Sequence, residues 1–166
     1  MNKYIYLFLA GIFCIACTNS TENQTSNNNQ THVGNKKFTK AHIQKLLDEG
    51  YKILEFVDPK TKDTLLMQQY FMAFLKKGKD TLQNPKTGDS LQRLHLAHLQ
   101  KMYDLGHADI SGPFGELDGN IRGVTIYNVP TLEIADSLAN ADPSVKAGRL
   151  EIEMHPWWAA KGYYLR

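Results

Sequence analysis

The chain has 166 residues, of which 42% are hydrophobic and 22% are charged, the composition of an ordinary folded protein. Its formal net charge is only +2 and its lysines are spread along the chain, so no basic patch points to nucleic-acid binding. Both cysteines, Cys14 and Cys17, fall in the first 17 residues. The rest of the chain therefore lacks disulfides and cysteine ligands, and we expect no cofactor and no metal.

The first 17 residues are typical of a signal peptide. Lys3 is followed by an apolar stretch over residues 4–15, which is too short to span a bilayer comfortably. Ala16 before Cys17 resembles the lipobox of bacterial lipoproteins, although Cys14 stands where a leucine is usual. The resemblance implies lipidation at Cys17 and a place in the cell envelope, on the periplasmic or outer surface. An ordinary cleaved signal peptide and an uncleaved N-terminal anchor are the alternatives.

Residues 18–35 form a polar linker that we expect to be disordered, because it has too few apolar side chains to offset its ordering entropy. Order is expected from about residue 36, where an N-terminal extension over residues 36–64 begins. Its helix starts at Thr39 and ends at Gly50, and the alternation over residues 51–57 predicts a strand.

Residues 64–75 are apolar on both faces, which is typical of a strand in the middle of a sheet; a buried helix is the competing interpretation. A polar loop is predicted over residues 79–89 and an amphipathic helix over residues 91–105. Gln92 and Arg93 fall off the apolar face of that helix. The face itself contains two histidines among its apolar residues: Leu91, Leu94, His95, His98, Met102 and Leu105.

After this helix, a strand over residues 107–111, a hairpin turn at 116–120 and a strand over 121–129 are predicted. A second helix begins near Thr131 and ends at Ala141-Asp142-Pro143, because the residue before a proline is pushed out of helical geometry. The last strand covers residues 149–155, with a tail over residues 159–166.

The order from Leu65 is strand, helix, strand, strand, helix, strand, which predicts an α+β protein with a ferredoxin-like βαββαβ fold. Two helices cover only one face of a four-stranded sheet. The other face carries more apolar side chains than solvent exposure explains, so we expect a homodimer of the dimeric α+β barrel type.

Four short motifs occur in the order typical of the YCII-related (YciI-like) family, and residues 65–158 resemble it: His95-Leu96, Gly112-Pro113-Phe114, Ala141-Asp142-Pro143 followed by Val145-Lys146-Ala147-Gly148, and Pro156-Trp157. The resemblance implies a small dimeric domain with a cleft and a His–Asp pair. Some relatives act on lactones or chlorinated ring-cleavage products.

The family's histidine is carried over to His95, which precedes Gly112 by 17 positions, and its aspartate to Asp142. His98 would need a gap in the helix to match. The family's arginine three or four positions before the histidine is absent, because Leu91 and Gln92 occupy those positions. Arg93 is the nearest substitute for an anion-binding arginine on this helix.

A histidine can act as acid or base near neutral pH, and a carboxylate on its far nitrogen fixes its tautomer. We therefore expect His95 and Asp142 to be catalytic, with Phe114, His98 and Ser111 as candidate substrate-binding residues. Plain packing of either histidine against the sheet is the alternative. The expected reaction is proton transfer on a small carbonyl or lactone compound, as in an isomerase, hydrolase or lyase. A non-catalytic ligand-binding or assembly module is the rival hypothesis.

Overall fold

The computed structural model describes residues 38–166 apart from 81–82, 117, 164 and 166. The expected signal segment with Cys17 and the linker over residues 18–35 lie outside the described residues. Within the part of the chain that is described, no helix is long and apolar enough to cross a membrane.

The order of elements after the N-terminal extension confirms the expected α+β, ferredoxin-like fold. The extension consists of helix α1 (Lys40–Asp48) and strand β1 (Ile53–Val57). The elements that follow are β2 (Thr64–Lys77), α2 (Pro85–Asp104), β3 (Ala108–Pro113), β4 (Ile121–Tyr127), α3 (Leu132–Asn140), α4 (Pro143–Lys146) and β5 (Leu150–Ala160). Every strand pairing is antiparallel.

Strand β2 is the centre of the sheet, as its apolar sequence predicts. β5 pairs with it over Met67–Lys77, along one edge. The opposite edge is shared, with β1 pairing at residues 64–68 and β4 at residues 71–76. β3 pairs with the outer edge of β4. The order β5-β2-β4-β3 is that of a ferredoxin-like sheet, with β1 added beside the first half of β2.

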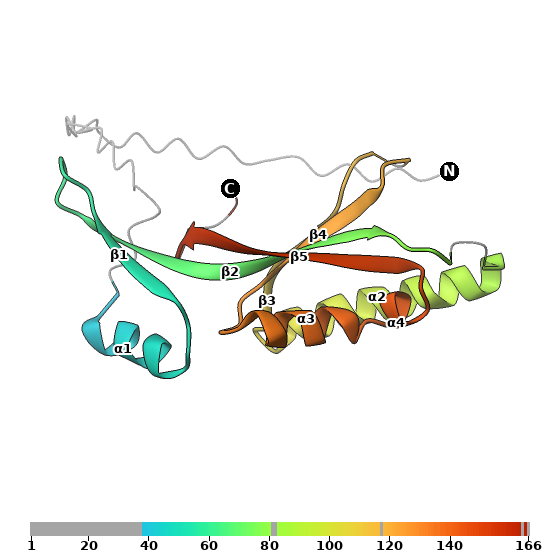
Figure 1. Ribbon diagram of the computed structural model, residues 1–166, viewed down its shortest axis with the longest axis horizontal. Helices are drawn as coiled ribbons and strands as arrows, with labels where there is room; N and C mark the ends of the chain where they lie inside the picture. Colours follow the sequence, from blue (N-terminus) through green and yellow to red (C-terminus); the bar gives the residue numbers. More distant parts are fainter. Residues whose placement is uncertain (1–37, 81–82, 117, 164, 166) are drawn as a thin grey trace, which may run out of the picture. The chain divides into compact units, whose positions relative to one another are not determined.

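Helices α2, α3 and α4 lie against one face of the sheet (Figure 1). The core forms between these layers and joins sheet and helix residues: Phe71, Ala73, Tyr127 and Val129 with Met102, Ala135 and Ala139. Ile152 and Met154 of β5 pack against the same cluster. Because side chains alternate along a strand, Met72 and Phe74 of β2 must face the other side of the sheet.

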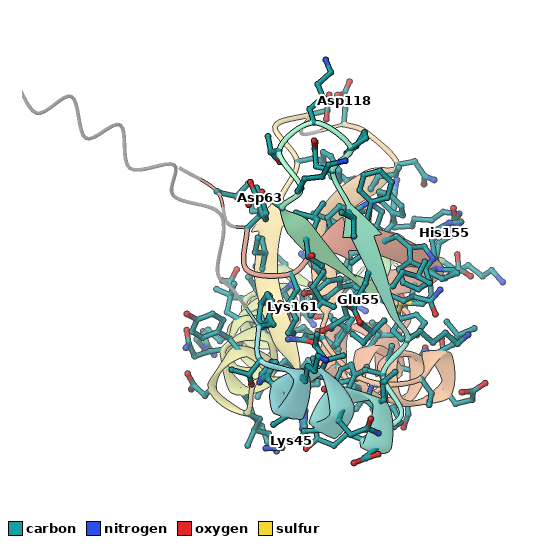
Figure 2. All side chains as sticks on the ribbon, turned by 90° about the vertical axis from the view of Figure 1, so that its left-hand side faces the viewer. Lys45, Glu55, Asp63, Asp118, His155 and Lys161 are labelled. Atoms are coloured by element: carbon teal, nitrogen blue, oxygen red, sulfur yellow. The ribbon has the colours of Figure 1, made fainter. Side chains whose placement is uncertain are left out.

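That second face, which α2, α3 and α4 do not cover, is here called the open face. The alternation places Met72 and Phe74 of β2 on it, opposite His155 and Glu153 of β5 in the strand register. Phe74 and His155 make an edge-on ring contact with centroids 5.7 Å apart. Figure 2 shows His155 on the sheet above the helix layer.

The structure corrects three boundaries. Helix α2 begins at Pro85 and not at residue 91, because the Asn84 side chain accepts a hydrogen bond from Thr87 N and caps the helix. The expected loop over residues 79–89 is therefore partly helical. Helix α4, capped by Asp142, was not expected. Strand β5 continues to Ala160, into the expected tail, because it stays paired with β2 as far as Met67.

Candidate active site

The side chain of His95 is buried against the sheet, with only 8% of the residue exposed. Each residue turns a helix by about 100°, so His98 lies about 60° to one side of His95 and Gln92 about 60° to the other. His98 faces α3, where its Nε2 lies 3.1 Å from the carbonyl oxygen of Leu138. Gln92 is on the opposite side, which the structure shows to be a cleft.

The structure brings His95 and Asp142 together. His95 Nδ1 lies 2.6 Å from Asp142 Oδ2, in a buried contact between residues 47 positions apart. The second carboxylate oxygen, Oδ1, accepts a hydrogen bond of 2.8 Å from the backbone N–H of Ser144. Asp142 is thus the N-cap of α4, and Pro143 occupies the first turn of that helix, where a proline costs no hydrogen bond.

The pKa of Asp142 is held below its usual value of 3.8 although the residue is only 2% exposed. Burial by itself would raise this pKa, but the hydrogen bonds from His95 and from the Ser144 amide and the nearby histidine charges outweigh it. The carboxylate is therefore ionised at neutral pH and can only accept hydrogen bonds. His95 Nδ1 must be the donor, which leaves Nε2 of a neutral His95 ring with a free lone pair.

His95 lines a cleft of about 550 Å³. The cleft is bounded by α2, by β3 and β4, and by α4 with the start of β5. Polar and charged residues along its lining are Gln92, His95, Ser111, Arg122, Thr125, Ser144 and Arg149. Apolar side chains such as Leu75, Leu96 and Leu99 supply the rest of the wall. An apolar cleft with a few convergent polar groups is the usual form of a small-molecule site.

Of the three candidate substrate-binding residues, the structure brings only Ser111 to this cleft. Ser111 lines it, and its hydroxyl lies 3.0 Å from that of Thr125. Phe114 is 39% exposed and is absent from the lining. His98 is absent from it too, because the turn of the helix directs its ring to α3. Among the described residues, no group of three or more histidine, cysteine or carboxylate side chains is arranged to hold a metal ion.

Sequence reasoning missed several residues that line the cleft, among them Gln92 on α2 and Arg149. Gln92 lies off the apolar stripe, and only the position of the sheet shows that this side is a cleft. Arg149 comes from the far end of the chain, just before β5. Arg93, the nearest substitute for the family's arginine, is exposed and does not line the cleft.

The fold and the cleft define an α+β protein of the ferredoxin-like class with a paired histidine and aspartate. Residues 70–157, more than half of the chain, match the YCII-related domain family. The chain belongs to this family.

Several solved chains are similar to this one. One of them is 5-chloro-2-hydroxyhydroquinone dehydrochlorinase (TftG) from Burkholderia phenoliruptrix AC1100, in complex with 2,5-dihydroxybenzoquinone. It is similar over 53% of this chain and 92% of its own, with 21% sequence identity and a TM-score of 0.41. No curated protein sequence matches the chain.

Proposed function

We propose that this protein is an enzyme that moves a proton on a small molecule bound in the cleft, with His95 as the catalytic acid or base. The observation that carries the proposal is the 2.6 Å contact between His95 Nδ1 and Asp142, on a histidine that lines the cleft. A histidine bonded only to backbone would favour a plain binding module instead, and His98 is an example of that arrangement.

In this mechanism Asp142 is a positioning residue that acts through His95. Its ionised carboxylate fixes Nδ1 as the protonated nitrogen and stabilises the ring once Nε2 has taken a proton. Nε2 would remove a proton beside a carbonyl group, or from a water that attacks a lactone, and return it later in the reaction. Isomerisation, elimination and hydrolysis all use this step, so the proposed substrate is a small carbonyl or lactone compound.

Proton abstraction can be followed before the natural substrate is known. The protein is incubated in D2O with a panel of small ketones, keto acids and lactones, and deuterium uptake and ring opening are followed by NMR. We expect His95→Gln to slow any catalysed exchange by about 100-fold or more, the usual contribution of a positioned acid or base. Asp142→Asn should cause a smaller fall.

His98→Gln is the matched control, because it changes the same residue type on the same helix outside the cleft. Its rate should stay within about twofold of the wild type, because the substitution changes no contact with the substrate, either when it is bound or in the transition state. A His95→Gln variant as fast as the wild type would exclude His95 as the acid or base. A panel ligand that binds in the cleft without any exchange or hydrolysis would favour the rival, a ligand-binding module.

We also propose that the protein is a homodimer in which the open face of each sheet packs on that of a second copy. Supporting this, Met72 and Phe74 bring apolar side chains to that face, and Trp157 of β5 is 42% exposed beside them. The resemblance to YCII-related proteins implies the same assembly. For the N-terminus we propose a lipid at Cys17 that anchors the chain in the cell envelope, on the basis of the sequence alone.

A further inference from the structure

We propose that the cleft recognises a carboxylate group on its ligand and that Arg149 is the residue that binds it. This inference rests on the proposed function in one respect, since it takes the His95 cleft to be the substrate site. It adds the chemical class of the ligand: a small organic acid whose carboxylate sits at one end of the cleft while the reacting atom lies at His95.

The backbone of Arg149 is fixed on both sides. Its N–H donates to the carbonyl oxygen of Ser144, the second residue of α4, at 3.0 Å. Its carbonyl oxygen accepts from the N–H of Gly78, which follows β2, also at 3.0 Å. The side chain therefore leaves a firmly held point beside the cleft, and it is half-buried there. A binding residue on such a support keeps its position when the ligand is absent.

The charge of the Arg149 guanidinium is not matched within the described part of the protein. Its one hydrogen bond there is a long contact of 3.5 Å from Nη1 to the neutral Gln83 Oε1. None of the ion pairs of the described residues includes it. The described lining of the cleft contains Arg122 as a second arginine and no aspartate or glutamate. A half-buried guanidinium with no carboxylate partner favours an anionic ligand, and its planar fork matches a carboxylate.

Gly88 makes room for this guanidinium. It is a buried residue in the first turns of α2, and a Cβ atom there would lie 3.0 Å from Arg149 Nη1. The spacing of four and then three residues puts Gly88, Gln92 and His95 on one face of the helix. The guanidinium, the Gln92 amide and the His95 ring therefore follow one another along the cleft.

This arrangement also limits the ligand's length. Gly88 and His95 are separated by two turns, or about 10 Å of helix axis. Side chains of a helix tilt toward its N-terminus, so the His95 ring shortens that span. A ligand that touches both Arg149 and His95 must therefore hold its carboxylate several atoms away from the atom that reacts.

The test compares binding of acids with that of their neutral amides. Benzoate, phenylacetate and 3-phenylpropionate, each with its primary amide, are titrated into the full-length protein and followed by NMR, with signals of the Arg149 side chain assigned. We expect at least one acid to bind about tenfold more tightly than its amide, and Arg149→Gln to reduce that ratio to about one. An acid series that binds no better than the amides, or a ratio that survives in Arg149→Gln, overturns the proposal.

Two further variants and one control keep the result interpretable. Arg149→Lys should keep only part of the preference, because an ammonium cannot bind a carboxylate with a planar fork. Gly88→Ala should reduce it with Arg149 still present, since a Cβ atom 3.0 Å from Nη1 forces the guanidinium to shift by a few tenths of an ångström. Arg93→Gln removes an exposed charge from the same helix outside the cleft and should leave the preference intact.

Failure of this inference and failure of the proposed function give different results. His95→Gln removes the proposed acid or base but leaves Arg149 in place, so it should keep the preference for acids. If that variant keeps the preference and also keeps full turnover, the proton-transfer mechanism is wrong and the carboxylate site stands. If turnover depends on His95 but wild-type protein binds acids and amides equally, the carboxylate site is wrong and the mechanism stands.

Discussion

Asp142 uses both of its carboxylate oxygens, one to cap α4 through Ser144 and the other to hold His95. Both partners are hydrogen-bond donors, so the residue is satisfied only as a carboxylate. Asparagine is as good an N-cap as aspartate but carries no charge. Asp142→Asn therefore separates the structural cap from the charged contact with His95.

The lowered pKa of Asp142 predicts a pH-dependent contribution to stability. A carboxyl whose pKa is lower in the folded state stabilises the fold fully above its unfolded value of 3.8, and this contribution is lost as the pH falls through the lower folded value. We expect wild type to exceed Asp142→Asn in free energy of unfolding by about 1–3 kcal/mol near neutral pH. The difference should shrink below about pH 4.

Urea denaturation of both proteins across this pH range measures the difference. Asp136→Asn, at an exposed position on α3, is the matched control and should change the free energy of unfolding by less than about 0.5 kcal/mol near neutral pH. A difference between wild type and Asp142→Asn that stays constant down to acid pH would contradict the assignment of a charged contact.

At the residue scale, the sequence predicts a contact only where a known motif already links two positions. The pairing of His95 with Asp142 is implied by the resemblance to the YCII-related family, and the structure places the two side chains in contact. No sequence motif indicates that the Arg149 side chain lies close to Gly88. It depends on where β5 starts relative to α2, which is a property of the packed fold.

At the scale of elements, two misread boundaries have one physical cause. Asn84-Pro85 and Asp142-Pro143 both indicate a turn, since asparagine and aspartate favour turns before a proline. Each is in fact an N-cap followed by a proline in the first helical turn. The local chemistry of such a pair is the same in a turn and at the start of a helix. Only the packing of the residues that follow decides which of the two forms. The start of α4 contributes Ser144 to the lining of the cleft.

The central strand and the helices were easier to predict because their apolar periodicity reports burial directly. β2 is the central strand, as its sequence predicts, but it buries one face at a time: Leu66, Gln68 and Tyr70 are buried in its first half, and Phe71, Ala73 and Leu75 in its second. Helix α3 ends at Asn140, close to where the sequence predicts, before Pro143. For elements in this order, the ferredoxin-like arrangement is the simplest topology.

The proposed dimer makes a prediction about two neighbouring tryptophans of β5. Successive residues of a strand face opposite sides, so Trp157 lies on the open face and Trp158 does not. Trp157→Ala should weaken the dimer by about 2 kcal/mol or more, the usual cost at a central interface tryptophan. Trp158→Ala is the control, with a similar exposed fraction of 37% against 42%. Sedimentation equilibrium measures both; a monomeric wild type, or equal effects of the two substitutions, would contradict the proposed interface.

At the scale of the whole molecule, the chain combines a folded YCII-related body with an N-terminal segment that only the sequence describes. The extension α1–β1 belongs to the body, because β1 is paired with β2 and Leu46 of α1 is buried. The proposed lipid site, Cys17, lies outside the described residues. Its assignment rests on the residues around it.

Mass spectrometry of the mature protein from bacterial membranes tests that assignment. We expect the chain to begin at Cys17 and to carry acyl chains there, since more than one chain is needed for stable anchoring. Cys17→Ser should abolish the added mass and release the protein from the membrane fraction. Ser20→Ala, in the polar linker that follows, is the control and should leave both unchanged. An unmodified Cys17 in the mature protein would exclude the anchor.

At Gly88, the residue that would best stabilise the helix conflicts with the space that the Arg149 side chain occupies. Inside a helix, alanine is more stable than glycine by about 0.5–1 kcal/mol, so a scheme for raising thermal tolerance would replace this glycine early. The methyl group it would add lies 3.0 Å from the Arg149 guanidinium. Substitutions meant to raise the thermal stability of this protein should therefore be placed at other sites, where they leave the position of Arg149 unchanged.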